Sequence, residues 1–565
     1  MNRRAANRIG GHSPRTVPGN GVSAGGLSRR RFLVGAVAGG TALWSGPASR
    51  SSSDRGDGAL DAFARAARSA KIAGYSISKV QRWLHEKALP LIDPDTGLYR
   101  ADGHWNYRDT AADCYPFLCW AAHLVDRRAL NGPVLGVLEA EQRLCNHVGR
   151  IPVRFDWTKK AKDTTVGYEA MVFGASEYVK DGLIAVVEAL GKGPWYERMK
   201  GIEEDLWKHA RIDTPFGKIP SKNVEVNGEQ IQALARLFTM TGNEQFLRWA
   251  ERLADFYLSD EQYVPQRLRD HGCEIIGGLG LLLAVESEVN PRQAERYRAR
   301  LAHMFDQILQ KGCNEDGLMY NRLGWPDSGL SDGWGYNYVA YLCYDMVVGR
   351  PRYREHVAKT LRNLSKPAYR DYVWEGRPPG SIDGFADSIE GAIYLLNRVP
   401  VPEGFAWVDR EMAHNVTRSH EPLATARLWG TMKLESNGVR TVIMHALMHT
   451  QGVIARPWRQ DLTLGAARGT DGRLAVVLTA ERPWRGVLEF ECPRHREFMG
   501  FRRDWPRMNT LPEWFPVQRE RTYRVRLEPA GAVLTRTGQQ LQEGLDVAVD
   551  PGRSLRLEVR TILAR

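Results

Sequence analysis

Apolar side chains recur at helical spacing along most of the chain, and the segments that carry them come in pairs. Apolar positions that repeat every three to four residues are typical of helices with one buried face. The pattern therefore predicts six helical hairpins. Their paired segments are 77–89 with 109–126, 133–148 with 175–190, 195–211 with 228–240, 243–258 with 271–289, 291–310 with 332–348, and 351–364 with 383–397.

The second segment of each pair is more apolar than the first. Residues 275–283 are all aliphatic or glycine, whereas residues 292–300 in the next segment are rich in charge. A helix that is apolar all round is buried, and a helix with a polar face is peripheral. We therefore expect an inner and an outer ring of helices, that is, an (α/α)6 toroid over residues 55–400.

Beyond residue 398 the pattern changes. The run Val399-Pro400-Val401-Pro402 is typical of a linker, and short β-branched stretches separated by Gly, Pro and Asp follow from about residue 420. They predict an antiparallel β-sandwich over residues 410–565, which makes the fold class mainly α with a β domain. The expected strands are 440–444, 474–478, 486–490, 522–527, 532–535, 545–549 and 555–562.

The first 50 residues contain a candidate export signal. Arg29-Arg30-Arg31-Phe32-Leu33 precedes the apolar run 34–44 and then small residues, which resembles a twin-arginine signal. The run is too short to span a bilayer, and no later segment is long and apolar enough to do so. We expect the twin-arginine export machinery as a partner, a periplasmic or extracellular location, and no stable membrane span after signal removal. A chance basic and apolar run is the alternative.

Bulk composition narrows the class of protein. The chain has 565 residues, which implies at least two domains, and its 43% hydrophobic and 25% charged residues are near the average for soluble proteins. The net charge of +12 would favour an anionic substrate, although an arginine-rich solvated surface gives the same value. No polybasic tail follows the leader, so we expect no nucleic-acid partner. The seven cysteines lack CxxC spacing, which favours buried thiols over disulfides.

Long polar loops lead into the second helix of each predicted pair. Long loops carry function more often than short ones. At one end of a closed ring they would line a single pocket, which predicts a pocket enzyme. The loops are 104–115, 163–178, 221–229, 266–274, 325–338 and 381–390.

Three turn motifs add a resemblance to a known group of enzymes. The motifs are Asp95-Thr96-Gly97-Leu98, Thr241-Gly242-Asn243-Glu244-Gln245-Phe246-Leu247 and Asn314-Glu315-Asp316-Gly317-Leu318. Together with the hairpin pattern over residues 60–400, they resemble the six-hairpin glycosidase-like enzymes with an (α/α)6 toroid. The resemblance implies a glycoside hydrolase or a polysaccharide lyase. It is architectural and assigns no catalytic residue.

Carbohydrate ligands require aromatic faces and planar polar groups, and the long loops contain both. The aromatic residues expected to bind substrate are Trp105, Tyr107, Tyr115, Trp334 and Tyr338, although such rings can instead pack the end of a toroid. The polar residues expected to bind substrate are Asp109, Glu225, Asn227, Glu229, Glu274, Asp332 and Asp383. Helix capping is the alternative role for Asp109, Asp332 and Asp383.

Hydrolysis of a glycosidic bond usually requires two carboxyl groups. Asp387 and Glu390 are three residues apart and share a face of an otherwise apolar helix. Burial there should raise a carboxyl pKa, as a general acid requires, so we predict that this pair is catalytic. This chemistry needs no cofactor, and no DxDxDG or HExxH motif predicts a metal site.

Two other hypotheses remain open. A polysaccharide lyase would cleave uronate chains by β-elimination, with Tyr336 or His271 as the base and arginines that neutralise the substrate carboxylate. For His271 the alternative role is a hydrogen bond to backbone at a helix end. The third hypothesis is a non-catalytic glycan-binding protein.

Overall fold

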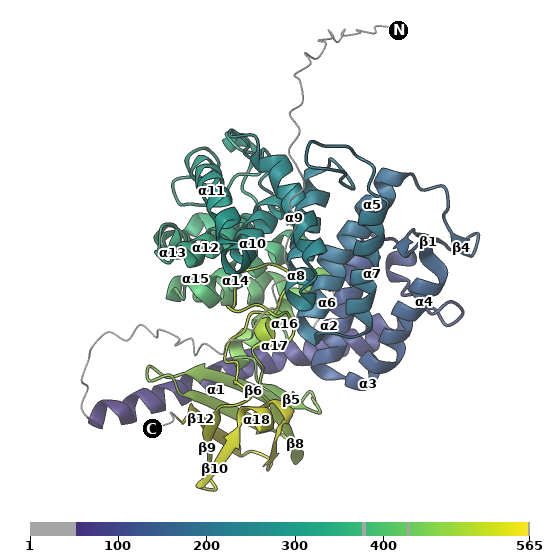
Figure 1. Ribbon diagram of the computed structural model, residues 1–565. Helices are drawn as coiled ribbons and strands as arrows, with labels where there is room; N and C mark the ends of the chain where they lie inside the picture. Colours follow the sequence, from purple (N-terminus) through teal and green to yellow (C-terminus); the bar gives the residue numbers. More distant parts are fainter. Residues whose placement is uncertain (1–51, 270, 376–379, 426–429, 563–565) are drawn as a thin grey trace, which may run out of the picture. The chain divides into compact units, whose positions relative to one another are not determined.

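The computed structural model describes residues 52–565 except 270, 376–379, 426–429 and 563–565 (Figure 1). The candidate twin-arginine segment lies outside the described residues, so export stays a prediction. No helix in the described ranges is long and apolar enough to cross a membrane.

Across those described ranges, seven helical pairs form a closed ring. Consecutive inner helices contact one another, and the last of them, α16, contacts α2 and so closes the ring. The outer helices are α1 (Ser52–Arg82), α4 (Leu135–Cys145), α7 (Pro194–Lys208), α9 (Glu244–Leu258), α11 (Pro291–Lys311), α13 (Arg354–Asn363) and α15 (Pro402–Glu411). The inner helices are η4 (Thr110–Cys114) continuing into α2 (Tyr115–Val125), α5 (Tyr168–Glu177) continuing through η6 (Tyr178–Leu183) into α6 (Ile184–Leu190), α8 (Val224–Thr241), α10 (Cys273–Val289), α12 (Trp334–Val348), α14 (Ile382–Arg398) and α16 (Met432–Thr450).

The predicted fold class is confirmed, and each of the six predicted hairpins is present. The seventh pair, α15 and α16, was not predicted, and the strand expected at 440–444 is wrong because these residues lie inside α16. Thr441, Val442 and Ile443 are fully or almost fully buried between neighbouring helices. Packing therefore overrides their β preference.

The predicted start of the β domain, near residue 410, also needs correction, because the seventh helical pair occupies this part of the chain. Helix α15 starts at Pro402, where proline is favoured because the first helical N–H needs no partner, so 399–402 is a short connection between helices. The first strand, β5, starts at Ile454 rather than near residue 410.

Close backbone contact holds the inner ring together. A Cβ added to Gly335 on α12 would lie 2.5 Å from backbone atoms of Gly391 on α14. The two helices can approach this closely only because neither residue carries a side chain. In α10, each residue from Cys273 to Glu286 is buried, as expected for an inner helix.

The remainder of the chain forms two antiparallel sheets, which confirms the predicted sandwich. The larger has the order β10-β9-β12-β7-β6, and the smaller has the order β11-β8-β5. Strand β6 packs on α1, next to the helical ring (Figure 1). The strands are β5 (Ile454–Arg456), β6 (Leu462–Arg468), β7 (Leu474–Ala480), β8 (Trp484–Glu489), β9 (Thr522–Glu528), β10 (Ala532–Thr537), β11 (Leu545–Val549) and β12 (Ser554–Thr561).

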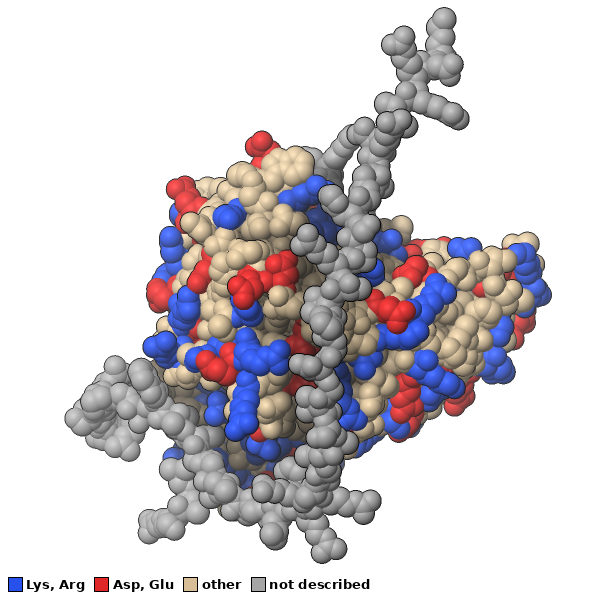
Figure 2. Space-filling view, turned by 45° about the horizontal axis from the view of Figure 1, so that its top comes forward, with Lys and Arg blue, Asp and Glu red and all other residues tan. Residues whose placement is uncertain are grey.

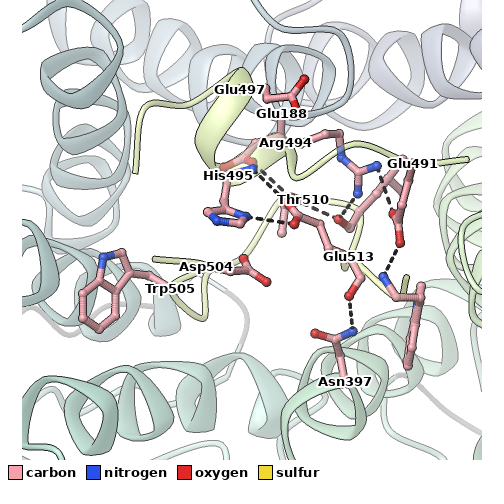
Figure 3. Close-up of polar contacts among 12 residues, drawn as sticks. Glu188, Asn397, Glu491, Arg494, His495, Glu497, Asp504, Trp505, Thr510 and Glu513 are labelled. Carbon is pink, nitrogen blue, oxygen red and sulfur yellow. Dashed lines mark hydrogen bonds and ion pairs between the residues drawn. The ribbon is translucent and has the colours of Figure 1, made fainter. Parts of the chain in front are cut away.

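The long connection between β8 and β9 reaches back to the helical ring, and we call residues 490–521 the plug. Figure 3 shows polar contacts within the plug and the bond that joins it to α14. In that bond, Asn397 Nδ2 on α14 donates to the backbone of Glu513 at 2.9 Å. Trp505 Nε1 donates to Glu288 on α10 at 3.0 Å. Glu188 on α6 accepts from Arg507 at 2.7 and 2.9 Å. These partners lie near the C-terminal ends of inner helices, so the plug occupies that end of the ring.

The surface charge and the burial of the cysteines bear on two of the predictions. Basic and acidic side chains alternate over the face seen in Figure 2, which fits an ordinary solvated surface. The seven cysteines all lie in described ranges, and five of them are buried. The expectation of buried thiols is therefore confirmed for most of them.

Candidate active site

One cavity opens where the inner helices begin. Because these helices run in the same direction around the ring, their N-terminal ends meet on one side. The cavity encloses about 620 Å³, part of it open to solvent. It is lined by Arg108, Asp113, Glu177, Lys180, Asp181, His271, Glu274, Tyr336, Asp383, Asp387, Glu390, Lys433, Asn437, Arg440, Met508 and Asn509.

The cavity is more acidic than the chain as a whole. Among the lining residues that the structure describes, seven are Asp or Glu and four are Lys or Arg. The net charge of +12 therefore does not extend into this cavity, and its lining does not favour an anionic substrate.

Asp387 and Glu390 face the cavity together, held by Arg440 and Tyr336. Arg440 on α16 forms ion pairs with both carboxylates, with its Nε 2.7 Å from Glu390 Oε2. The Tyr336 hydroxyl donates to Glu390 at 2.7 Å and to Asp387 at 3.2 Å. Tyr394 donates to the other Glu390 oxygen at 2.6 Å. The two carboxylates are therefore held in place, and Arg440 offsets part of their negative charge.

The Arg440 guanidinium is strongly held in its charged form. Burial opposes that charge, but Glu390, the Tyr336 oxygen and Asp387 outweigh it and raise the pKa of Arg440 well above its usual value. Burial, followed by the charges of Asp387 and Glu390, raises the pKa of Tyr336 well above its usual value. Tyr336 is therefore a hydrogen-bond donor in this arrangement.

A second group of acids surrounds Lys433, which lies one turn before Asn437 on the same helix. Lys433 Nζ lies 3.2 Å from Asp113 Oδ2 and 3.2 Å from Asp109 Oδ1. Burial raises the pKa of Asp113 to about 7, although Lys433 acts in the opposite direction. Burial also raises the pKa of Asp383, whose carboxylate accepts from Asn437. Asp113 therefore keeps a proton at neutral pH more readily than an ordinary carboxyl group.

A third group lies at the start of α8 and α10. His271 has a φ of 63°, in the left-handed region, and its Nδ1 lies 2.5 Å from Glu225 and 3.4 Å from Glu177. Both carboxylate oxygens of Glu229 are buried and have no hydrogen-bond partner among the described residues. Burial, then the neighbouring Glu225, raises the pKa of Glu229 well above its usual value.

This third group is also where a cation could be held near the cavity. Ligand atoms of Glu177, Glu225 and His271 lie within 4.8 Å of one another, and so do those of Glu177, Asp181 and Glu229. Lys180, however, already supplies a positive charge there. Its Nζ lies 2.6 Å from Asp181 and 2.8 Å from Glu274.

The plug completes the cavity from the far end of the ring. Met508 and Asn509 line the cavity, and Asn509 Nδ2 donates to Asp181 Oδ1 at 3.0 Å. Asn509 has a φ of 55°, and asparagine tolerates this left-handed conformation better than most residues. A segment of the β region therefore contributes directly to the site.

The cavity unites six of the residues predicted from sequence. Asp387, Glu390, His271 and Tyr336 line it, as expected of the candidate catalytic group, and so do Glu274 and Asp383. Glu225 and Glu229 belong to the neighbouring acidic group around His271. Whether any of them acts in catalysis stays a prediction.

The predicted aromatic binding residues need correction, because their rings pack the core and do not line the cavity. Trp105, Tyr107, Tyr115, Trp334 and Tyr338 are all at most 4% exposed. Three of them form internal hydrogen bonds: Tyr107 donates to Glu141, Tyr115 to the backbone of Val134, and Trp334 to Ser388. The alternative role, packing the end of the toroid, is the one that their positions support.

Several predicted polar residues also have other roles. Asn227 donates to the Tyr257 hydroxyl and is fully buried, and Asp332 is buried and accepts from the backbone of Gly333. Asp109 lies beside Lys433 but does not line the cavity. The capping alternative is wrong for Asp383, because Ser381 caps α14.

Sequence reasoning missed the residues that come from α16, η6 and the plug. Lys433, Asn437 and Arg440 follow helical spacing on one face, a signal that was lost because residues 410–565 were predicted to form a β-sandwich. Glu177 and Asp181 are four residues apart in a predicted helix, which was a usable signal for a shared face. Asn509 carried no local signal, since only the fold brings the plug to the cavity.

Comparison with known proteins gives only distant structural matches. No family model matches this sequence, and no curated protein matches it. The structure is similar to the GH76A alpha-1,6-mannanase from Salegentibacter sp. HEL1_6, with 14% identity, 55% of this chain and 96% of that chain covered, and a TM-score of 0.35. It is also similar to Ara127N-Se, a GH127 beta-L-arabinofuranosidase from Geobacillus stearothermophilus T6, with 9% identity, 86% and 76% covered, and a TM-score of 0.36.

A third match is the cellobiose 2-epimerase from Bacillus thermoamylovorans B4167. It has 12% identity, 65% of this chain and 98% of that chain covered, and a TM-score of 0.35. Similarity at this level does not identify an activity, which depends on the residues of the site itself.

Proposed function

We propose that the chain is a carbohydrate-active enzyme, and specifically a glycoside hydrolase that works by carboxylate acid/base catalysis. The observation that carries the proposal is that one cavity contains carboxyl groups in opposite environments. Asp387 and Glu390 are compensated by Arg440, whereas burial raises the pKa of Asp113 to about 7. Carboxyl groups whose environments differ in this way suit the separate roles of acid and base.

In this proposal Asp113 is the general acid. Its proton passes to the glycosidic oxygen as the bond from that oxygen to the anomeric carbon breaks. The charged carboxylate of Asp387 stabilises the positive charge that develops on the sugar ring. As a base it takes a proton from the water that attacks the anomeric carbon; as a nucleophile it bonds to that carbon until water displaces it. Arg440 and Tyr336 are positioning residues that fix the Asp387 carboxylate.

A neutral sugar fits the lining better than a uronate. The acidic surplus would repel a substrate carboxylate, whereas Asn437, Asn509 and Arg108 offer donors for sugar hydroxyl groups. The same observations argue against the lyase hypothesis. Its candidate base, Tyr336, donates to two carboxylates that raise its pKa, so loss of its proton is unfavourable.

The test is a screen of the purified protein against neutral and acidic oligosaccharides with two readouts. Hydrolysis releases new reducing ends, whereas β-elimination leaves an unsaturated uronate that absorbs ultraviolet light. We expect reducing ends without that absorbance, and loss of turnover in Asp113→Asn and in Asp387→Asn. Asp213→Asn is the matched control, because its side chain is 84% exposed and does not line the cavity.

Two results would overturn the proposal. One is ultraviolet absorbance that develops in step with turnover, which would make the protein a lyase. The other is sugar binding by the wild type with no turnover on any substrate that binds, which would make it a glycan-binding protein.

A further inference from the structure

A cluster of two histidines and an aspartate lies on α15 and α16, apart from the residues that line the cavity. Asp409 Oδ1 lies 2.8 Å from His445 Nε2 and 2.8 Å from His449 Nε2. The two Nε2 atoms are 3.1 Å apart, and the imidazole planes are nearly perpendicular, at 83°. Three potential metal-ligand atoms therefore converge on one point.

We propose that Asp409, His445 and His449 bind a zinc ion. Zinc takes histidine nitrogen and carboxylate oxygen at about 2.0–2.2 Å, usually with tetrahedral geometry. Tetrahedral ligands at that distance are about 3.3 Å apart. The three observed separations, 2.8, 2.8 and 3.1 Å, differ from this by a few tenths of an ångström. Small side-chain movements would thus admit the ion.

Hydrogen bonding alone leaves this cluster poorly satisfied. A neutral imidazole has one N–H donor and one acceptor nitrogen. If both Nε2 atoms donate to Asp409, two N–H groups oppose each other across 3.1 Å. If His445 instead carries its proton on Nδ1, its Nε2 lone pair faces the Asp409 oxygen at 2.8 Å with no proton between them. A cation between the two Nε2 lone pairs removes the conflict between them.

The surroundings of the cluster also suit a bound metal. His449 Nδ1 lies 3.0 Å from Ser69 Oγ on α1, so the ring can donate to Ser69 while its Nε2 faces the ion. Such a bond on the second nitrogen orients a metal-bound histidine. His445 is 2% exposed, whereas the Asp409 side chain is 37% exposed, which leaves one side open for entry and for a water ligand.

The position in the fold explains what the ion would do. His445 and His449 are one helical turn apart on α16, Asp409 is on α15, and Ser69 is on the first helix of the ring. The ion would therefore join the seventh hairpin to the first at the point where the ring closes. His445 and His449 lie five and nine positions after Arg440, about 8 and 13 Å along the helix axis, and none of the three ligands lines the cavity. The ion would therefore stabilise the fold and would not touch the substrate.

The test is a metal titration of the full chain after treatment with a chelator. We expect the wild type to bind one equivalent of Co²⁺, with the visible absorption of a tetrahedral site, to release it to Zn²⁺, and to unfold at a higher temperature with Zn²⁺ than without it. His449→Asn and Asp409→Asn should lose these effects. His420→Asn is the matched control, because this histidine is 55% exposed, lies outside the cluster and should change nothing.

Ser69→Ala keeps all three ligands and is the second test in case the ligand variants do not fold. Loss of such a supporting bond weakens metal affinity about 10-fold to 100-fold. The proposal is overturned if the wild type takes up no cobalt in saturable fashion, or if a folded His449→Asn variant binds it as tightly as the wild type. Because none of the three ligands lines the cavity, neither result depends on the hydrolase proposal.

Discussion

Arg440 Nε lies 2.7 Å from Glu390 Oε2, and this contact joins the seventh inner helix to the sixth. The same guanidinium also contacts Asp387, so two mostly buried carboxylates depend on one cation. Stability and the proposed catalysis are therefore linked at this point of the ring.

Arg440→Met should destabilise the protein markedly. Methionine fills similar space but leaves Asp387 and Glu390 without their cation, and removal of one partner from a buried pair costs about 3–5 kcal/mol. Chemical denaturation followed by circular dichroism measures the change. Arg248→Met is the control, since Arg248 is 53% exposed and pairs with Glu244 at the surface, where the loss should be about 0.5 kcal/mol or less. Equal losses in the two variants would contradict the view of Arg440 as a buried counter-ion.

Activity should fall as the pH rises through about 7, because the proposed general acid must carry a proton. Burial raises the pKa of Asp113 to about 7, above the value of 3.8 for an exposed aspartate. The profile of kcat/KM against pH should therefore show an alkaline limb near this value. Asp113→Glu should shift the limb, and Asp113→Asn should retain too little activity to show one. An unchanged limb in an active Asp113→Glu variant would assign the titration to another group.

The raised pKa of Asp113 also predicts that the stability of the protein depends on pH. The folded state holds the Asp113 proton more tightly than the unfolded state, so the contribution to stability is complete below about pH 4 and is lost as the pH rises to about 7. Asp113→Asn cannot ionise and should flatten this part of the curve of unfolding free energy against pH. A curve that keeps its slope in Asp113→Asn would rule out this source of pH dependence.

Asn509→Gly should separate substrate binding from stability. Glycine adopts the left-handed φ of 55° freely, so the fold should lose little, but the bond to Asp181 disappears from the cavity wall. We expect a several-fold increase in KM with a nearly unchanged unfolding midpoint. Asn509→Ala should add a backbone penalty of about 1 kcal/mol to the same kinetic defect. An unaltered KM in both variants would mean that the plug only fills space.

Glycine-to-alanine substitutions in the inner and outer rings should have opposite effects on stability. Gly391→Ala would bring a Cβ to within 2.8 Å of the Gly335 backbone and should cost about 1–3 kcal/mol, because the helices must separate. Gly136 lies within α4, with no atom within 4 Å of an added Cβ. Gly136→Ala should therefore stabilise the helix by about 0.5–1 kcal/mol. Thermal unfolding of the two variants in parallel measures both effects.

The spacing of apolar residues was sufficient to predict the first six helical pairs, but not the seventh pair, which closes the ring. Segments such as 275–283 and 292–300 differ so clearly in polarity that inner and outer helices could be assigned from sequence. The segment 440–444 could not, because its β-branched residues fit a strand as well as a buried helix, and only contacts with α14 and α2 decide between the two. The pattern of His445 and His449 at helical spacing was lost with it.

The site was most predictable where its residues share one helix. Asp387 and Glu390 could be found because three-residue spacing places them on one face. Their partner Arg440 comes from a different helix, and Asn509 from a loop between two strands, so no local pattern connects them. Trp105 and Trp334 were misassigned because an aromatic residue in a polar loop has the same sequence signature whether it meets a ligand or the core.

The closure of the ring between α1 and α16 determines when this protein can first become active. Lys433, Asn437 and Arg440 are supplied by the last inner helix, and the plug that carries Asn509 follows it in the chain. During synthesis, an open arc of six hairpins persists until α16, which ends at Thr450, has emerged from the ribosome, and the cavity is complete only after Asn509 has followed. Such late, long-range closure makes folding slow and leaves apolar helix faces uncovered in the nascent chain. Truncation before α16 should therefore yield aggregation-prone fragments and no partially active enzyme.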